Sequence, residues 1–498
     1  MNTATEATTS RKPAGYAWLK KQYALSDIAH DHVSWLGSVS TRRITSMGEV
    51  FPARKFTPTD TLSGHLEFAL KYDGINLQLL YELFNKVKQE EIVDLIKQRQ
   101  SGIYSRKIWF LYEFLLDAKL PIDDLEAGNY IALLNPDEYC VREFKDKSER
   151  KLYLSSRQRV VNNLLGNNRF CPLVRTQELN WQVLHDRAIA VLSEYDNATI
   201  IGAINYLYTK ETRSSFAIEN ETPSKDKVER FGKALRHAKD WKSLNKSTYL
   251  ELQKIMLNRP ADDYRTMQNY VGETIGMNEY IHFIPPKPED VNSLMDGLEE
   301  FLNKSESLNP VIVAALASFG FVFIHPFEDG NGRIHRFMIH YILSSRGVTP
   351  DDVIFPVSAT MLENMKAYDS CLESFSVPVK ALIDYETNED LSIHVKNDTA
   401  YLYRYFDATP IVSYLYQCIA DTIEVGLKQE LELLDKFRQV KKIIDQEMDV
   451  SNIDLDRFIN FCHQNNGTLS IKKRERFFKD YTDDQLARMQ EIYQSYFT

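Results

Sequence analysis

The sequence has little cysteine, and its cysteines do not have the spacing of a metal site. Among the 498 residues there are five cysteines, at wide spacing and without a CxxC pair: Cys140, Cys171, Cys371, Cys418 and Cys462. An odd, scattered set is typical of a reduced protein without a structural zinc site. The opening stretch MNTATEATTSRKPAG also lacks the apolar segment of a secretory signal. We therefore expect a cytoplasmic location.

A long hydrophobic run is missing as well. The longest apolar segment, Val311–Ile324, has fourteen residues and is broken only by Ser318 and Gly320. Fourteen helical residues extend over about 21 Å, which is too short for a hydrocarbon layer of roughly 30 Å. The segment predicts a buried core helix, and we expect no membrane partner.

An excess of positive charge is absent too. The formal net charge is −10, which argues against a protein whose main partner is nucleic acid. Two stretches, residues 142–159 and 470–477, are locally basic. We interpret both as solvated surface, so nucleic acid is not an expected partner.

The length of 498 residues predicts two to four domains. We expect a partly disordered leader at 1–55, a helical N-terminal domain at 56–184, a second helical block at 185–385 and a helical C-terminal domain at 386–498. Apolar residues at three- and four-residue steps support the helical assignments. The expected fold class is mainly α.

One segment departs from the helical pattern. In MNEYIHFIPPKPEDV, residues 277–291, apolar and polar residues alternate until Pro285 and Pro286 end the alternation. The segment predicts a strand of one small β-hairpin.

The twelve residues HPFEDGNGRIHR, 325–336, concentrate chemistry-bearing side chains. A helix is predicted to follow, because five apolar residues fall on one helical face: Ile334, Phe337, Met338, Tyr341 and Ile342. The three residues that precede this helix are Gly330, Asn331 and Gly332. They form a loop whose N–H groups can bind an anion at the helix start. Arg333 and Arg336 lie on the other side of the first turns, against the helix dipole, which favours a polyphosphate ligand.

Other residues of the motif are candidates for the metal ligand and the general base of a transfer reaction. Asp329 is a candidate Mg²⁺ ligand, because Mg²⁺ bound to phosphates needs few protein oxygens. His325 follows the apolar run and is a candidate general base. We interpret His335 and His340 as structural, since no HExxH or CxxC pattern supports a zinc site with His325. The set predicts nucleotidyl or phosphoryl transfer.

The stretch resembles the signature of the Fic family, HPFx(D/E)GNGRxxR, at every fixed position. Three neighbouring segments are similar to the family as well: DDYRTMQNYVG (262–272), YIHFIPP (280–286) and PVSATMLENMKAYDSCL (356–372). The resemblance covers roughly residues 195–380. It implies a Fic (Fido-fold) helical core with the hairpin as a flap, between helical N- and C-terminal domains.

The resemblance implies a role for each matching residue. His325 is the base that deprotonates a target hydroxyl, Asp329 binds Mg²⁺, and the phosphates are held by Gly330, Asn331, Gly332, Arg333 and Arg336. Tyr368 is expected near the nucleotide base. The flap is expected to dock the target through Thr274, Ile275, Gly276, Tyr280, Ile281 and Phe283. ATP is the implied co-substrate and a protein Tyr, Thr or Ser hydroxyl the acceptor; this protein itself and a homodimer are among the partners that the resemblance allows.

A second motif lies about a hundred residues earlier. SSFAIENE, residues 214–221, resembles the inhibitory motif (S/T)xxxE(G/N) of the family, with Ser215, Glu219 and Asn220 at its fixed positions. Ser215 and Glu219 would share a face of a helix near 205–220, and Asn220 suits the left-handed residue that ends one. The resemblance supplies Arg336 as the partner of Glu219, and thereby predicts self-inhibition.

Three functions remain open from the sequence. The first is Mg²⁺-dependent transfer of AMP from ATP to a protein hydroxyl, inhibited by Glu219. The second is the removal of AMP from modified proteins at the same site, with Glu219 orienting a water. The third is a nucleotide-sensing adaptor without transferase activity, whose terminal helical domains bind a partner.

Overall fold

The computed structural model describes residues 11–30, 32–257, 261–275, 278–388 and 390–497. The chain divides into two compact units. The first comprises Met1–Leu179, Trp241–Ile342 and Lys366–Leu415, and the second Asn180–Asp240, Leu343–Met365 and Tyr416–Thr498. The mainly helical fold predicted from the sequence is confirmed.

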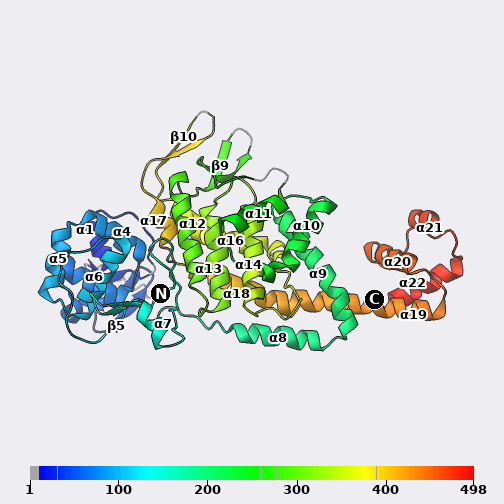
Figure 1. Cartoon of the computed structure of the whole chain (residues 1–498), viewed down its shortest axis with the longest axis horizontal. Helices are drawn as coiled ribbons and strands as arrows, with labels where there is room; N and C mark the ends of the chain where they lie inside the picture. The colour runs from blue at the N-terminus through cyan, green and yellow to red at the C-terminus, as the bar shows by residue number, and fades with distance from the viewer. Residues whose placement is uncertain (1–10, 31, 258–260, 276–277, 389, 498) are drawn as a thin grey trace, which may run out of the picture. The chain divides into compact units, whose positions relative to one another are not determined.

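The N-terminal part of the first unit, blue and cyan in Figure 1, combines helices with small sheets. Its helices are α1 (Tyr16–Gln22), α2 (Ala53–Phe56), α3 (Leu62–Phe68), α4 (Leu77–Lys86), α5 (Gln89–Gln98), α6 (Ile103–Leu116) and α7 (Lys147–Leu152). A four-stranded sheet has the order β1-β2-β4-β3, from Lys12–Ala14, Ser34–Gly37, Gly48–Pro52 and Arg43–Thr45. A three-stranded sheet pairs β5 (Ile131–Ala132), β7 (Val160–Val161) and β6 (Leu154–Ser155). The sequence predicted neither sheet, because strands of two to five residues carry almost no periodic signal.

The remainder of the first unit is a helical core. Its helices are α11 (Lys246–Met256), α12 (Pro288–Asn303), α13 (Pro310–Ile324), α14 (Asn331–Ser345), α16 (Met365–Lys380), α17 (Ala400–Arg404) and α18 (Thr409–Asp421). Helix α13 is the predicted core helix: all but one of its residues are buried. Asn309 caps it by accepting a hydrogen bond from the N–H of Val311 at 2.9 Å, and Pro310 occupies the first turn.

Two hairpins extend from this core. Strands β8 (Val271–Ile275) and β9 (Asn278–Phe283) pair antiparallel with an irregularity between Val271 and Gly272, and Pro285 and Pro286 follow β9. The strand predicted at 277–291 is therefore present. The second hairpin, β10 (Tyr385–Thr387) with β11 (Ile393–Val395), was not predicted.

The second unit is helical. It contains α8 (Trp181–Ser193), α9 (Asn197–Ile218), α10 (Lys225–Arg236), α15 (Val357–Glu363), a π-helical turn (Thr422–Leu427), α19 (Lys428–Glu447), α20 (Asn452–Gln464), α21 (Ile471–Phe477) and α22 (Asp483–Phe497). Helix α9 packs against α10, α15 and α19. The last helices enclose a small apolar cluster that includes Val440, Phe458 and Tyr493.

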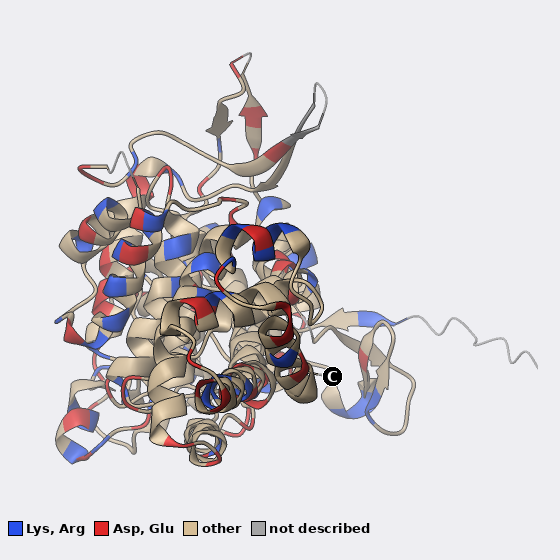
Figure 2. Ribbon diagram, turned by 90° about the vertical axis from the view of Figure 1, so that its right-hand side faces the viewer, with Lys and Arg blue, Asp and Glu red and all other residues tan. Residues whose placement is uncertain are grey.

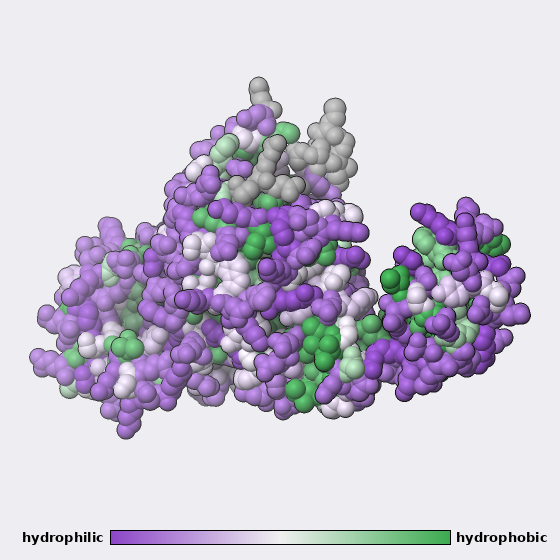
Figure 3. All heavy atoms as spheres, turned by 45° about the vertical axis from the view of Figure 1, so that its right-hand side comes forward, coloured by the Kyte–Doolittle hydropathy of each residue, from purple (hydrophilic) through white to green (hydrophobic). Residues whose placement is uncertain are grey.

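The surface is polar and of mixed charge. Figure 2 shows acidic and basic residues interspersed along the helices, and hydrophilic residues predominate on the face drawn in Figure 3. Some exposed large apolar side chains come from separate segments, for example Ile44, Leu152 and Ile471, whereas Val183 and Ile189 share helix α8. Single exposed apolar residues are ordinary on protein surfaces. Within the described ranges, every helix is too short or too polar to cross a membrane.

A substitution at Gly320 of α13 tests how tightly this core is packed. A Cβ atom at Gly320 would lie 2.6 Å from Cζ of the fully buried Phe170. We expect Gly320→Ala to lower the free energy of unfolding by about 1–3 kcal/mol, because the buried ring or the helix must shift to make room for the methyl group. Gly202→Ala in α9 is the control: a Cβ there meets no described atom within 4 Å. Thermal unfolding should show the control to be as stable as the parent or up to about 1 kcal/mol more stable.

Candidate active site

His325 ends helix α13. It lies one residue beyond the helix in the left-handed conformation, with φ 51° and ψ 57°, and its N–H donates to the carbonyl of Phe321 at 2.9 Å. Its ring atom Nδ1 is 3.1 Å from the carbonyl oxygen of Val322. A carbonyl can only accept, so Nδ1 carries the hydrogen and the neutral ring has its lone pair at Nε2. The half-buried imidazole is thus in the tautomer of a base acting through Nε2.

Asn331 closes the loop that follows. Its side-chain Oδ1 accepts from the N–H of Phe327 at 3.0 Å, and its Nδ2 donates to the carbonyl of Phe327 at 2.8 Å. This pair of hydrogen bonds is buried, since Asn331 is only 2% exposed. Gly330, with φ 91°, makes the turn into α14 that a residue with a side chain would strain. The loop therefore delivers the first N–H groups of α14 in one place, where an anion can bind.

The two arginines of the motif lie differently from the prediction. Arg333 and Arg336 were expected on the side of α14 away from the core, but they are 3% and 1% exposed, because α14 is surrounded by protein. The Nη2 atom of Arg333 donates to Oδ1 of Asp329 at 2.7 Å. Such a bond is charge-assisted, so it fixes the side chain of Asp329 relative to that of Arg333.

The residues present fit a Mg²⁺ ion only together with phosphates. The side chain of Asp329 is 67% exposed and offers carboxylate oxygens. Among the described residues, no group of three or more His, Cys, Asp or Glu side chains could hold a metal. A single carboxylate suffices for Mg²⁺ when phosphate oxygens and waters complete the shell.

Tyr368 of α16 and His335 of α14 are both buried. The ring of His335 is fully buried between Phe319, at 4.5 Å, and Tyr368, at 6.3 Å between centroids. Burial and the charge of Arg336 lower the pKa of His335 to about 3, so it is neutral at physiological pH. Tyr368 is 4% exposed, and its predicted place near a nucleotide base stays a prediction.

The flap is held at its base by packed aromatic side chains. Phe283, predicted to dock a target, has a buried side chain that packs against Phe323, Phe375 and Tyr403. Its side chain therefore anchors the hairpin and offers no docking surface. Tyr280 is exposed, and the carbonyl of Ile281 accepts from Nζ of Lys380 at 2.5 Å. Thr274 and Ile275 belong to strand β8, and Gly276 lies outside the described residues.

Two positioning residues were missed by the sequence analysis. Arg265 is 5% exposed, and its side chain donates to three carbonyls: His325 at 2.9 Å, Met267 at 3.0 Å and Pro286 at 2.5 Å. Burial lowers the pKa of Arg265 to about 10, which still leaves it charged. Gln253 of α11 donates to the carbonyl of Asp329 at 3.0 Å. Nothing in their spacing marks these residues, although Arg265 falls in the segment 262–272 that resembles the family.

The predicted inhibitory residues lie at the end of α9 in the second unit. Ser215 is buried within the helix, Glu219 follows its last residue and is exposed, and Asn220 has a positive φ of 55°. The expected helix end at Asn220 is thus present. The carboxylate of Glu211, one turn before Ser215, accepts from the N–H of Ser358 at 2.8 Å and from its hydroxyl, which fixes α9 to the start of α15.

Comparison with known proteins agrees with the geometry. The model of the Fic/DOC family matches residues 243–343. Protein adenylyltransferase Fic of Drosophila mojavensis is 43% identical over 113 residues, which cover 22% of this chain and 20% of the relative. The Drosophila grimshawi protein of the same name is 42% identical over 113 residues, 22% of this chain and 21% of the relative. The match thus spans about a fifth of these relatives. Residues 243–343 form a Fic/DOC family domain, homologous over that region to these adenylyltransferases.

Solved structures with similarity to the chain carry the same family name. A Fic domain containing signaling protein from Bacteroides thetaiotaomicron aligns with a TM-score of 0.36 and 20% identity, over 50% of this chain and 96% of that one. A Fic family protein from Desulfovibrio desulfuricans aligns with a TM-score of 0.36 and 16% identity, over 64% and 88%.

Arg265 can be tested as the residue that joins the flap to the catalytic loop. Arg265→Met should lower the free energy of unfolding by at least about 2 kcal/mol, because buried carbonyls lose their donor. Amide hydrogen exchange of residues 278–286 should also become faster. Arg187→Met, which removes a half-exposed guanidinium paired with Glu424, should change neither. Unchanged exchange in the flap of Arg265→Met would contradict the assignment.

Proposed function

We propose that this protein transfers AMP from ATP to the hydroxyl of a Tyr, Thr or Ser side chain in a target protein, with Mg²⁺. The observation that carries the proposal is the tautomer of His325, which presents Nε2 as a base beside a helix-start loop built for phosphates. The Fic/DOC domain at residues 243–343 and the names of its Drosophila relatives support this reaction.

The proposed reaction is an in-line displacement at the α-phosphorus of ATP. Nε2 of His325 takes the hydroxyl proton as the hydroxyl oxygen bonds to phosphorus. The bond from the α-phosphorus to the oxygen that bridges to the β-phosphate breaks, and pyrophosphate leaves with that electron pair. The N–H groups at the start of α14, with Arg333 and Arg336, would hold the phosphates. Bound Mg²⁺ would offset negative charge on the phosphate oxygens, held by Asp329.

Binding of the phosphates would rearrange the loop. Arg333 donates to Asp329 at 2.7 Å, and both groups are assigned to the nucleotide. If Asp329 held Mg²⁺ instead, the guanidinium of Arg333 would be available to a phosphate oxygen. We therefore expect Mg²⁺ and ATP to bind cooperatively.

We further propose that Glu219 inhibits transfer. Its carboxylate would pair with Arg336 and prevent that arginine from orienting the terminal phosphates of ATP. Three observations support the proposal: the match to the inhibitory motif, the helix end at Asn220, and the exposure of Glu219 at that end. A carboxylate at a helix C-terminus is disfavoured by the negative end of the helix dipole, and a cationic partner would offset this cost.

Replacement of His325 tests the catalytic assignment. His325→Ala should reduce transfer of label from ATP carrying ³²P at the α-phosphate by about 10²–10⁴-fold, because the base is lost. ATP affinity measured by calorimetry should remain within a few-fold, since the imidazole serves the hydroxyl. His237→Ala, an exposed histidine that pairs with Asp240, is the control and should transfer normally. If the parent and a Glu219→Gly variant both transfer no label to any protein, the adaptor function is favoured instead.

Replacement of Glu219 separates inhibition from the removal of AMP. Glu219→Gly should raise AMP transfer and self-modification by about 10²-fold, the scale expected when a misplaced α-phosphate becomes aligned. It should also abolish any release of AMP from modified protein, because the group that would orient water is gone. Glu221→Gly, in the same turn but paired with Lys227, is the control. Parent-like rates of both reactions in Glu219→Gly would rule out self-inhibition.

A further inference from the structure

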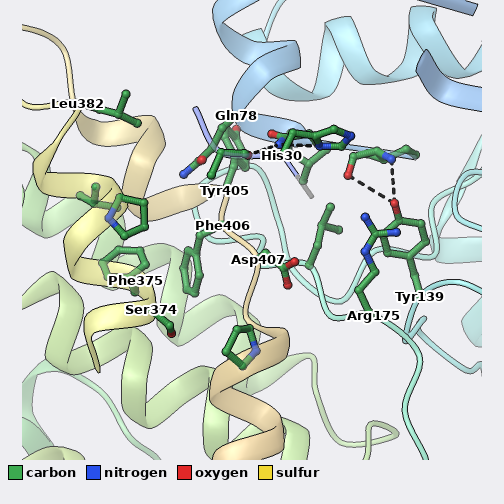
Figure 4. A pocket seen from close by; sticks show the side chains of 18 residues that line it. His30, Gln78, Tyr139, Arg175, Ser374, Phe375, Leu382, Tyr405, Phe406 and Asp407 are labelled. Carbon is green, nitrogen blue, oxygen red and sulfur yellow. Dashed lines mark hydrogen bonds between the residues drawn. The ribbon is translucent and has the colours of Figure 1, made fainter. Parts of the chain in front are cut away.

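The first unit contains a cavity of about 210 Å³ that is separate from the phosphate loop. Figure 4 shows it between the start of α4, the second half of α16 and residues 405–410, with His30 and Arg175 from loops. Its volume corresponds to about seven waters at roughly 30 Å³ each. A single-ring molecule of roughly ten to twelve non-hydrogen atoms is therefore the size that fits.

One side of the cavity is apolar. Phe375, Leu382 and Phe406 line it, together with Pro378 and Val379. In Figure 4, Phe375 and Leu382 lie on the side opposite Arg175. The ring centroids of Phe375 and Phe406 are 4.9 Å apart and the ring planes are inclined at 66°, so the two rings form a corner. Apolar walls that are already packed favour a ligand with an aliphatic or aromatic body.

The other side carries a cation. The guanidinium of Arg175 lies 4.9 Å from the ring centroid of Tyr139, whose hydroxyl accepts from the N–H of Ile75 at 2.8 Å. In the described part of the chain, Arg175 forms no ion pair with a carboxylate. Its neighbour His30 does not add charge, because burial and Arg175 lower the pKa of His30 to about 4. A partly buried arginine in this setting is suited to bind a carboxylate.

An acid lies at the edge of the same cavity. Asp407 is exposed, and its Oδ1 accepts from the N–H of Thr409 at 2.8 Å. The carboxylate disfavours a ligand that is only anionic and favours one with an ammonium group as well. Arg175, Asp407 and the apolar wall therefore match, in that order, the carboxylate, the ammonium group and the side chain of an apolar α-amino acid.

We propose that this cavity binds a small zwitterion of the apolar α-amino acid type. Its carboxylate pairs with Arg175, its ammonium with Asp407, and its side chain packs on Phe375 and Phe406. The proposal does not depend on nucleotide chemistry. One wall of the cavity is connected to α13, since Phe375 stacks on Phe323 at 4.0 Å, two residues before His325.

Calorimetry on the full chain, without nucleotide, tests the proposal. L-Phenylalanine and L-leucine should bind with one site per chain. Phenylethylamine lacks the carboxylate, and 3-phenylpropionate lacks the ammonium group. Each should bind at least about tenfold more weakly than L-phenylalanine, because one charge-assisted pair is lost. Absence of binding by both amino acids overturns the proposal. Equal binding of 3-phenylpropionate and L-phenylalanine overturns the zwitterion and the role of Asp407.

Variants locate the binding. Arg175→Met should abolish binding, whereas Arg187→Met, at an exposed arginine, should leave it unchanged. Ser374→Trp should block the mouth of the cavity without altering either charge, since Ser374 is exposed and lines it. It therefore tests the site even if Arg175→Met does not fold. Parent-like binding by Ser374→Trp or Arg175→Met would show that the amino acid binds elsewhere and would overturn the assignment.

Discussion

The burial of α13 is the constraint on which the candidate active site depends. A helix that is apolar on every side can lie only in the centre of the core, and its end is then determined by the helices around it. His325 directly follows this end and turns out of the helix in the left-handed conformation. The imidazole is consequently held by the best-packed element of the first unit, which suits a base that must meet a hydroxyl at hydrogen-bond distance.

Around that helix end, buried polar side chains hold the loops through their backbone groups. Asn331 binds both backbone groups of Phe327, Gln253 binds the carbonyl of Asp329, and Arg265 binds carbonyls on both sides of the flap and at His325. Backbone groups in a buried loop need such partners, because water cannot reach them. Buried side chains thus set the positions of the backbone groups in this loop.

The proposed regulation uses a second helix, α9, which is only partly buried. Helix α9 is fixed along its length: Glu211 binds the start of α15, and Lys210 pairs with Glu430 of α19 at 2.6 Å. Near its end Ser215 and Phe216 are buried, and the ring of Phe216 packs against that of Phe231 in α10 at 5.9 Å between centroids. A rigid helix that ends in a left-handed asparagine presents one carboxylate, Glu219, in a defined direction. The C-terminal helix α19 therefore contributes to holding the proposed inhibitory residue, which gives this part of the chain a role that the sequence alone did not suggest.

The sequence by itself determined the features that are local. The twelve-residue motif identified the family, which the comparisons confirm; the apolar run predicted α13, and the alternation before Pro285 predicted β9. These succeed because a helix period, a strand period or a loop sequence is contained within a few consecutive residues. The same reasoning misplaced Arg333 and Arg336 at the surface, because periodicity on one helix does not show what packs on its other side.

Only the tertiary structure decided the parts that join distant segments. Arg265 resembles any other arginine in the sequence, yet its acceptors at Pro286 and His325 lie 21 and 60 residues away. Phe283 reads as a docking residue in a flap, but three aromatic rings from other segments bury it. The cavity lined by Phe375 and Arg175 likewise draws on residues from Ala29 to Pro410. Such sites depend on burial and on hydrogen bonds between remote parts of the chain, and these exist only once the chain has folded.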